Sequence, residues 1–485
     1  MNLIEKFRTG VPGLDIITHG GIPKGRSTLI CGRSGTAKTI LSLQIATNLA
    51  RSGVKTLVVA VEETPEDLVT TSASLGFELA DLLEKGLIQV SDLTRPAEGP
   101  TYVSGAYDIA GLVDRIGGMV RESGAQALVL DSATALFSPR PRDEELRAHF
   151  FHLIHAFRRL GITAVVTAEA KSDDSDQLTT LGVEDYVCDA VIVLRNHVDG
   201  ERRRRSVEVH KYRRSAHYKG EYPCTISARG VTVFPLDAQD RTELEQHDRF
   251  SSGAAGLDAM NSGGWLRDSI VLLRGPSGSG KTTLAGMYAR AGAARGERVV
   301  YYGFEETKPI LMRNFASLGL PLEELERGGK LRVACRYPEA TSPEDLLIDL
   351  RVGLDEFKPS LIVLDSISSI EHSTSRHGFR QFMVGVASQL REHGRSALLI
   401  QTVGSNQNEE RDAPFLSTIP DAICLLDYDR AGRDLERTIQ VLKMRGSPHV
   451  TEKREMHIEQ GGLRIGHLPR PDTHAAPFSL PGPGA

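Results

Sequence analysis

The chain has 485 residues, of which 40% are hydrophobic and 25% charged, and its formal net charge at pH 7 is −5. This length exceeds what one hydrophobic core usually serves, so we expect roughly two to four globular domains. The composition excludes a largely disordered protein, and the negative charge gives no overall attraction to nucleic acid or to an anionic membrane.

The five cysteines are scattered and include no C-x-x-C pair, which argues against a disulfide framework and against a zinc ribbon. The first residues lack the apolar segment of a signal peptide, and no apolar run reaches the length of a membrane span. We therefore expect a soluble, cytoplasmic protein.

The first motif in the chain is a glycine-rich loop between an apolar run and a helix-like stretch. Residues 32–39 read Gly-Arg-Ser-Gly-Thr-Ala-Lys-Thr and follow the apolar run Ser27–Cys31. This is the pattern of a nucleotide phosphate loop, except that Ala37 replaces the glycine before the lysine. A methyl group there is tolerated at negative φ and strained at positive φ, so the sequence leaves the quality of this nucleotide site open.

Acidic residues follow two later apolar runs. Glu62 and Glu63 come directly after Thr56–Val61, and Asp131 closes the run Ala127–Leu130. An acid that ends a strand after a phosphate loop typically holds the Mg²⁺ of the bound nucleotide. The adjacent glutamates could supply a general base for water or a hydroxyl group, although acids at this position could also simply begin a helix.

Short apolar runs alternate with helix-like stretches along the whole chain. Besides those just named, the strand candidates are Thr163–Thr167, Ala190–Leu194, Val299–Tyr302, Leu361–Leu364, Ala397–Ile400 and Ala422–Leu426. This alternation predicts an α/β fold in which a mostly parallel sheet is covered by helices on both faces. Nucleotide is then expected at the carboxyl ends of the strands.

The second half of the chain repeats the first. Lys281 follows Lys38 by 243 positions (281 − 38), and Glu305 follows Glu62 by the same number (305 − 62). Such a spacing means two copies of a whole domain. We expect a first domain at residues 1–240, a second at 247–460, and a flexible tail rich in proline and glycine at 461–485.

The loop of the second copy, Gly275–Thr282, fits the phosphate-loop pattern at every fixed position. Its glycines let backbone N–H groups converge on phosphate oxygens, and the following helix directs the positive end of its dipole to the same anion. Lys281 is expected to reach the β- and γ-phosphates, and Thr282 to ligate Mg²⁺. A plain glycine-rich turn is the alternative, which the strand–loop–helix context disfavours.

Together with the loops, four further motifs resemble the KaiC family of circadian-clock ATPases and autokinases, within the RecA-like superfamily. These motifs are the paired Glu-Glu-Thr triplets, the segment Gly200–Arg205 with Lys211–Arg213, the segment Lys443–Ser447, and Phe415–Ile419. The resemblance covers nearly the whole chain up to about Glu459. It implies two tandem RecA-like domains, stacked in a double-ring homohexamer with ATP between neighbouring subunits.

The resemblance also implies roles for individual residues. Glu62 and Glu63 become the water-activating pair of a slow ATPase, and Glu305 and Glu306 the base and Mg²⁺-side acid of a kinase site. ATP contacts in the first copy, partly from the adjacent subunit, are Gly32, Ser34, Gly35, Thr36, Ala37, Lys38, Thr39, Ile40, Ser74, Lys211, Tyr212, Arg213, Ser215 and His217. Those in the second copy are Gly275, Ser277, Gly278, Ser279, Gly280, Lys281, Thr282, Thr283, Leu318, Arg437, Lys443, Met444, Arg445, Gly446, Ser447 and His449. The expected Mg²⁺ ligands are Thr39, Asp131, Thr282, Glu305 and Asp365.

Ser417 and Thr418 match the adjacent phosphoacceptors of the family. Two departures from the family pattern lie beside them: Pro420 stands where the family has another hydroxyl, and residues 408–412 are more acidic. Taken alone, a Ser-Thr pair more often serves only to hydrogen-bond a turn.

Two further features receive structural interpretations. Arg202–Arg205 could bind nucleic acid, but it is flanked by Glu201 and Glu208 and is better explained by a hairpin or an interface. His149, His152 and His155 share a helix face without a carboxylate or cysteine at ligand spacing, so we expect surface or packing histidines and not a metal site.

The sequence therefore predicts a Mg²⁺-dependent homohexamer that hydrolyses ATP and phosphorylates its own serine and threonine, in circadian-type timing or other signalling, with Kai-type proteins as partners. A RecA/DnaB-like DNA motor is the first alternative, although the sequence offers no added nucleic-acid module. An ATP-assembled signalling scaffold without kinase activity is the second.

Overall fold

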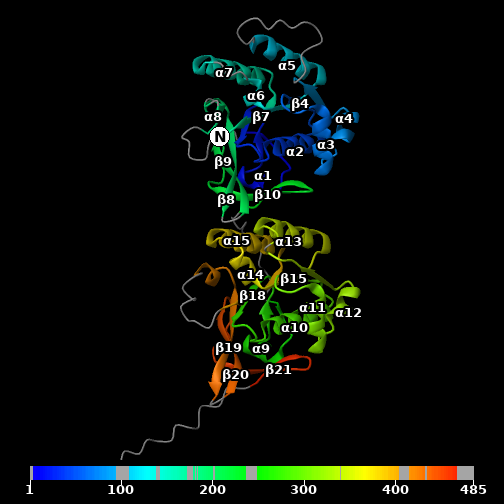
Figure 1. Ribbon diagram of the computed structural model, residues 1–485, viewed down its shortest axis with the longest axis vertical. Helices are drawn as coiled ribbons and strands as arrows, with labels where there is room; N and C mark the ends of the chain where they lie inside the picture. The colour runs from blue at the N-terminus through cyan, green and yellow to red at the C-terminus, as the bar shows by residue number, and fades with distance from the viewer. Residues whose placement is uncertain are drawn as a thin grey trace, which may run out of the picture. The chain divides into compact units, whose positions relative to one another are not determined.

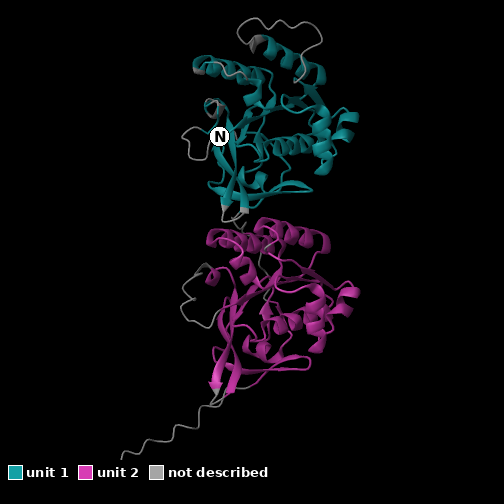
Figure 2. Ribbon diagram, viewed as in Figure 1, with its two compact units in different colours: residues 1–236 teal, residues 237–485 magenta. Residues whose placement is uncertain are grey.

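The computed structural model describes residues 4–93, 109–137, 142–171, 178–180, 182, 184–199, 202–235, 248–338, 340–403, 414–431 and 434–466. The chain divides into two compact units, Met1–Leu236 and Asp237–Ala485 (Figure 2). Each unit has its own main sheet and its own buried core.

The first unit alternates strands and helices in the order expected of an α/β domain (Figure 1). Its strands are β1 (Lys6–Phe7), β2 (Ile22–Pro23), β3 (Ser27–Gly32), β4 (Thr56–Ala60), β5 (Ile88–Asp92), β6 (Ala127–Asp131), β7 (Thr163–Glu169), β8 (Ala190–Asp199), β9 (Arg202–Tyr212), β10 (Glu221–Ser227) and β11 (Gly230–Val233). Its helices are α1 (Leu14–Ile17), α2 (Lys38–Arg51), α3 (Pro65–Ser74), α4 (Leu79–Glu84), α5 (Ile109–Ser123), α6 (Ala133–Leu136), α7 (Asp143–Arg159) and α8 (Glu184–Val187).

The main sheet of the first unit has the strand order β11-β10-β9-β8-β3-β7-β6-β4-β5. The strands from β8 to β5 pair in parallel, whereas β8, β9, β10 and β11 form an antiparallel extension. The parallel strands bring their carboxyl ends, and the segments that follow them, to one edge of the sheet. The fold class predicted from the sequence is confirmed.

The second unit repeats this architecture. Its strands are β12 (Arg249–Phe250), β13 (Trp265–Leu266), β14 (Ile270–Gly275), β15 (Val299–Gly303), β16 (Leu331–Cys335), β17 (Leu361–Asp365), β18 (Ser396–Thr402), β19 (Ala422–Ala431), β20 (Asp434–Met444), β21 (Arg454–Glu459) and β22 (Gly462–Ile465). Its helices are α9 (Ala255–Met260), α10 (Lys281–Ala294), α11 (Lys308–Ser317), α12 (Leu322–Arg327), α13 (Pro343–Phe357), α14 (Ile367–His372), α15 (Arg376–His393) and the 3₁₀ turn η2 (Pro414–Ser417). The sheet order β22-β21-β20-β19-β14-β18-β17-β15-β16 matches that of the first unit strand for strand.

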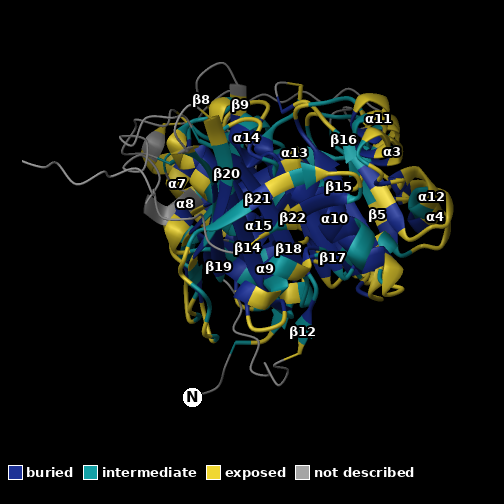
Figure 3. Cartoon of the chain, turned by 90° about the horizontal axis from the view of Figure 1, so that it is seen from below, coloured by how far each residue is buried: buried dark blue, intermediate teal, exposed yellow. Residues whose placement is uncertain are grey.

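Side chains alternate between the two faces of the parallel strands, and both faces are covered. On β3, Ile30 joins the buried cluster formed with α2 and α4, while Leu29 joins the cluster formed with α5 and α7. A strand that is buried on both faces reads as a continuous apolar run, which is why the sequence located these strands. Figure 3 shows α10 and neighbouring strands of the second unit in the buried colour and the outer helices largely exposed.

One predicted boundary is wrong. Residues Gly462–Ile465, which we assigned to the flexible tail, form β22 and pair with β21. The turn at Gln460 and Gly461 joins the two strands, and Leu463 is buried in the core of the second unit. The folded part of this unit therefore extends to at least Ile465, and residues 467–485 lie outside the described part of the chain.

Candidate nucleotide sites and the acceptor turn

The phosphate loop of each unit leaves the carboxyl end of the central strand and enters a long helix. In the first unit β3 ends at Gly32 and α2 begins at Lys38; in the second, β14 ends at Gly275 and α10 begins at Lys281. Neither helix has a side-chain cap at its first residue. Because first-turn N–H groups have no partner within a helix, they remain able to bind a phosphate.

Glycine is required where the second loop begins. A Cβ atom added at Gly275 would lie 2.2 Å from the carbonyl oxygen of Leu426, which is closer than any real contact. At the end of the loop Gly280 has φ +102°, a conformation that favours glycine. The corresponding Ala37 has φ +79° and ψ +30°, so the strained case that the sequence left open is the one that occurs.

The two loop lysines fold back onto their own loops. The Lys281 ammonium donates to the carbonyl oxygens of Gly275 and Pro276 at 2.8 and 2.7 Å, and Lys38 donates to that of Arg33 at 3.1 Å. Burial lowers the pKa of Lys281, although the charges of Asp365 and Glu305 act in the opposite direction. A buried ammonium group inside the loop is suited to meet an anionic phosphate.

The strand-ending aspartates lie against these loops. Asp131 accepts a hydrogen bond from Thr39, and Asp365 accepts one from Thr282. Burial raises the pKa of Asp131, and it raises the pKa of Asp365 to about 6. A threonine hydroxyl beside a carboxylate is the donor set that Mg²⁺ takes in phosphate-loop proteins, so these residues fit the expected ion.

Each of these aspartates has a second hydroxyl partner that sequence reasoning missed. Thr167 on β7 donates to Asp131, whereas Tyr301 on β15 donates to Asp365. Both donors are buried. The equivalent aspartates therefore accept their second hydrogen bond from non-equivalent strands of the two units. An alignment of the two halves of the sequence could not have identified these donors.

The paired glutamates lie beside the aspartates and are held by serines. Ser132 donates to Glu62, and Ser366 donates to the same oxygen position of Glu305 at 2.5 Å. Each serine directly follows the strand-ending aspartate, and the Asp-Ser dipeptide recurs in both copies. That recurrence is the sequence signal that could have identified the two serines.

The second glutamate of each pair has its own surroundings. Asn314 on α11 donates to Glu306 at 3.0 Å. In the first unit, burial raises the pKa of Glu63, and the nearby charges of Asp131 and Asp67 add to the effect. A carboxyl group with a raised pKa is a stronger proton acceptor once ionised.

The predicted cations Lys211 and Lys443 lie at the other edge of the sheet from the loop of their own unit. β9 runs antiparallel to β8 and brings Lys211 opposite Val191, near the start of β8. β20 likewise brings Lys443 opposite Ile423, near the start of β19. The loops follow the carboxyl ends of the central strands, so these lysines approach a different edge.

In the second unit this edge carries the predicted phosphoacceptors. The Lys443 ammonium donates to the carbonyl oxygens of Ser417 and Pro420 at 2.8 and 2.7 Å. The Arg445 guanidinium donates to the carbonyl oxygen of Thr418 at 2.9 Å. Both acceptor residues are exposed, and we call residues 417–420 the acceptor turn. The acidic segment 408–412 lies outside the described residues.

Several predicted ATP contacts also have structural roles within the chain. The Tyr212 ring is buried and its hydroxyl donates to the Gly21 carbonyl at 2.9 Å, and Met444 lies in the core. Lys6 donates to Ser215 at 2.7 Å, and Arg249 donates to Ser447. The partly buried His217 and His449 follow in the same two turns, and burial lowers the pKa of His217.

Three predicted contacts lie elsewhere. Arg437 donates to the Gly278 carbonyl at 3.2 Å, which places it at the phosphate loop of its own chain and apart from Lys443. Ser74 ends α3 and Leu318 follows α11, whose first turns begin beside the paired glutamates. Ten helical residues span about 15 Å, so these two positions lie at the far ends of helices that begin beside the glutamates, and their contact with ATP stays a prediction.

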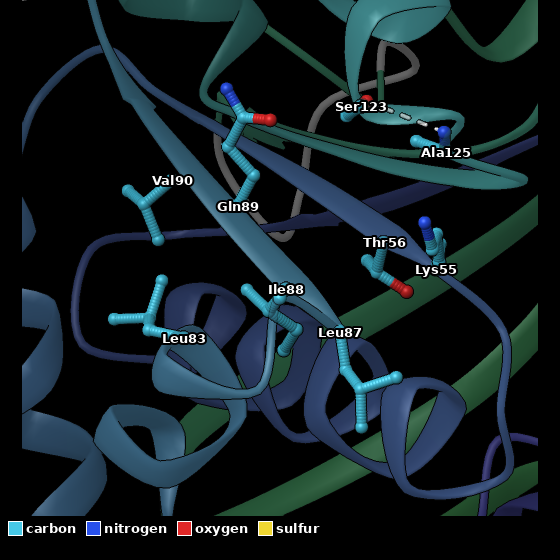
Figure 4. A pocket seen from close by; sticks show the side chains of 10 residues that line it. Lys55, Thr56, Leu83, Leu87, Ile88, Gln89, Val90, Ser123 and Ala125 are labelled. Atoms are coloured by element: carbon cyan, nitrogen blue, oxygen red, sulfur yellow. Dashed lines mark hydrogen bonds between the residues drawn. The ribbon is translucent and has the colours of Figure 1, made fainter.

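A pocket in the first unit lies apart from the phosphate loop. It has a volume of about 390 Å³, lies near the starts of β4 and β5 and is lined by Lys55, Thr56, Ile88 and Ser123 (Figure 4). Since the starts of parallel strands face away from the nucleotide edge, it is not part of the phosphate site. Within the described residues, no group of three or more His, Cys, Asp or Glu side chains forms a metal cluster. In that same part of the chain, no helix is both long and apolar enough to cross a bilayer.

A family model described as the KaiC ATPase matches residues 7–238 and, a second time, residues 250–470. The chain belongs to the KaiC family of ATPases. Relatives named circadian clock oscillator protein KaiC, from Picosynechococcus sp. and Synechococcus elongatus, are 37% identical over 95% of this chain and cover 90% and 89% of their own lengths. The KaiC 1 protein of Synechocystis sp. is 36% identical over the same share of the chain. The resemblance inferred from the paired loops and triplets is confirmed, and membership of the family makes the chain a nucleotide-binding ATPase.

Proposed function

We propose that the chain is a Mg²⁺-dependent ATPase and serine/threonine autokinase that works as a homohexameric ring. The main support for this proposal is the position of Lys443 and Arg445. They bind the backbone of Ser417 and Thr418 at the edge of the sheet opposite the phosphate loop of their own unit. A nucleotide can meet these cations and acceptors together if it is bound to the loop of another copy. The family expectation of ATP between subunits supplies that arrangement.

Each site binds nucleotide through groups with distinct tasks. The N–H groups of loop and helix hold the phosphates, and Lys38 or Lys281 compensates their charge. Thr39 with Asp131, and Thr282 with Asp365, would hold Mg²⁺, which would supply positive charge to the phosphates. The lysine contacts to loop carbonyls hold each ammonium group at its own loop.

The first unit is the hydrolytic site in this proposal. Glu63 has a raised pKa and lies beside Glu62, so one carboxylate accepts a proton from water while its neighbour orients it. The water oxygen forms a bond to the γ-phosphorus, the bond to the bridging oxygen breaks, and ADP and phosphate leave. Ser132 fixes Glu62 in place during this step.

The second unit transfers phosphate to protein. A hydroxyl oxygen of Ser417 or Thr418 attacks the γ-phosphorus, its proton passes to Glu305, and ADP leaves with the bridging oxygen. Ser366 and Ser369 donate to Glu305 at 2.5 and 3.3 Å and thereby orient the carboxylate. Lys443 and Arg445, supplied from the acceptor's own subunit, stabilise the charge on the transferring group.

The relatives' names suggest the biological setting. Since these proteins are called circadian clock oscillator proteins, we propose a role in circadian-type timing or related signalling, with Kai-type proteins as partners. Two alternatives compete with this proposal: a DNA-dependent motor, and a scaffold that uses ATP only for assembly.

Intact mass measurement after incubation with Mg-ATP, followed by peptide mapping, tests the proposal. The expected result is phosphate on Ser417 and Thr418, in rings whose formation on nucleotide addition is followed by light scattering. ATP turnover that requires DNA would favour the motor. Rings that neither turn over ATP nor gain phosphate would favour the scaffold.

A further inference from the structure

The acceptor turn of the second unit has a counterpart in the first. The Asp421 N–H, one residue beyond that turn, donates to the Ile270 carbonyl at the start of the central strand, at 2.8 Å. In the first unit the Asp189 N–H donates to the Ser27 carbonyl, again at the start of the central strand, at 3.0 Å. Each aspartate thus fixes the end of a turn at the same place in its sheet.

The family cations approach the two turns in the same way. The Arg445 N–H donates to the Asp421 carbonyl at 2.8 Å, and the Arg213 N–H donates to the Asp189 carbonyl at 2.8 Å. The Arg445 guanidinium then reaches the carbonyl oxygen three residues before its aspartate, that of Thr418.

In the first unit the residue three positions before the aspartate is Tyr186. Its carbonyl oxygen accepts a hydrogen bond from the Arg213 guanidinium at 3.0 Å, as that of Thr418 does from Arg445. Tyr186 therefore occupies the place of the second phosphoacceptor, and Asp185, which has no hydroxyl, occupies that of Ser417.

Tyr186 brings a hydroxyl group to this place and leaves it accessible. The residue is 65% exposed, at the rim of a hollow of about 230 Å³ that is also lined by Phe151 and Ile154 of α7. We propose that Tyr186 is a phosphoacceptor of the first unit, modified by ATP bound to the loop of a neighbouring copy. This inference rests on the proposed intersubunit transfer.

The first site supplies the groups that the step needs. The phenolic oxygen bonds to the γ-phosphorus, the bond to the bridging oxygen breaks, ADP leaves, and the phenolic proton passes to the Glu62–Glu63 pair. Glu62 is held by Ser132 as Glu305 is by Ser366, so the two sites present their bases alike. A phenol ionises more readily than water, which makes Tyr186 a competitor of water for the same phosphate.

The test uses the full chain with Ser417→Ala and Thr418→Ala, so that the acceptors proposed for the second unit are removed. After incubation with Mg-ATP, peptide mapping is expected to find phosphate on Tyr186. Tyr186→Phe keeps the aromatic ring and removes the acceptor hydroxyl, so phosphate at position 186 must vanish. Glu62→Gln with Glu63→Gln keeps the loop, and the initial rate of labelling should fall at least about 100-fold.

The outcomes separate this inference from the proposed function. Phosphate on Ser417 or Thr418 of the unmodified chain, with none on Tyr186 in either chain, would overturn the inference and leave the autokinase. No phosphate on any residue of the unmodified chain would overturn both. Labelling of Tyr186 that persists in the double glutamine variant would exclude the first site as its source and also overturn the inference.

Discussion

Replacing Ala37 by glycine should stabilise the first unit. Ala37 has φ +79°, and a left-handed conformation costs an alanine roughly 1–2 kcal/mol. Glycine adopts this conformation freely but loses more entropy on folding, by roughly 0.5–1 kcal/mol. The expected gain in the free energy of unfolding is therefore about 1 kcal/mol, or about 2–4 °C in Tm for a unit of this size.

The second unit provides the matched control. Gly280 holds the corresponding position with φ +102°, and a Cβ added there would lie 3.3 Å from Leu463 Cδ2. Gly280→Ala should therefore lower the stability of the second unit by the backbone term and by the crowding of Leu463. Ala37→Gly removes the strain of an alanine at positive φ, and Gly280→Ala introduces that strain at the equivalent position of the second unit.

The chain contains one tryptophan, Trp265, which is buried in the second unit, so its fluorescence reports the unfolding of that unit. Far-ultraviolet circular dichroism reports both units. Under urea denaturation, Ala37→Gly should move the dichroism transition upward and leave the Trp265 transition in place, whereas Gly280→Ala should lower the Trp265 transition. An Ala37→Gly chain that is no more stable, or less stable, would refute the strain argument.

Three further substitutions test individual groups. Asp365→Asn should raise the nucleotide-free stability of the second unit at pH 7 by up to about 3 kcal/mol, because the pKa of Asp365 in the folded chain is about 6 and exceeds the ordinary value of 3.8, so folding disfavours the ionised carboxylate. The gain in stability should shrink as the pH falls from 6 toward 4. The same substitution should abolish Mg²⁺-dependent nucleotide binding. Urea unfolding at several pH values measures the first effect, and a gain that grows on acidification would contradict it. Glu62→Gln with Glu63→Gln should slow steady ATP turnover about 100-fold, measured by phosphate release, while Ser417 and Thr418 are still labelled. Unchanged turnover would show that neither glutamate is the general base. Lys443→Ala should abolish that labelling, whereas Lys453→Ala, which breaks only the pair with Asp429, should retain it; equal loss in both would point to a general structural effect.

The sequence located most of the parallel strands, the loops and the acids for clear physical reasons, but it missed the outermost parallel strands β5 and β16. Strands buried on both faces read as apolar runs, and the phosphate loop needs glycine and lysine at fixed spacings. The constant offset between Lys38 and Lys281 revealed the duplication directly. Each strand, loop and acid motif depends on residues close together in the chain.

Features that depend on distant residues were not predictable. Thr167 and Tyr301 support the two aspartates from different strands, and neither lies within a motif. Arg437 was grouped with Lys443, but only the register of β19 and β20 shows that one lies at the loop and the other at the far edge. The antiparallel extension was also missed in large part, because β9 begins with four arginines and does not read as an apolar run.

The central claim is that phosphate passes from nucleotide on one subunit to the acceptor turn of another. Mixing a Lys281→Ala chain, which keeps the acceptors, with a Ser417→Ala/Thr418→Ala chain, which keeps the loop, tests it most directly. In Mg-ATP each variant alone should remain unlabelled at the acceptor turn, and the mixture should gain phosphate on Ser417 and Thr418 of the Lys281→Ala chain. Mixed rings that form, as shown by co-purification of one variant through an affinity tag on the other, yet leave those residues without phosphate would contradict transfer between subunits.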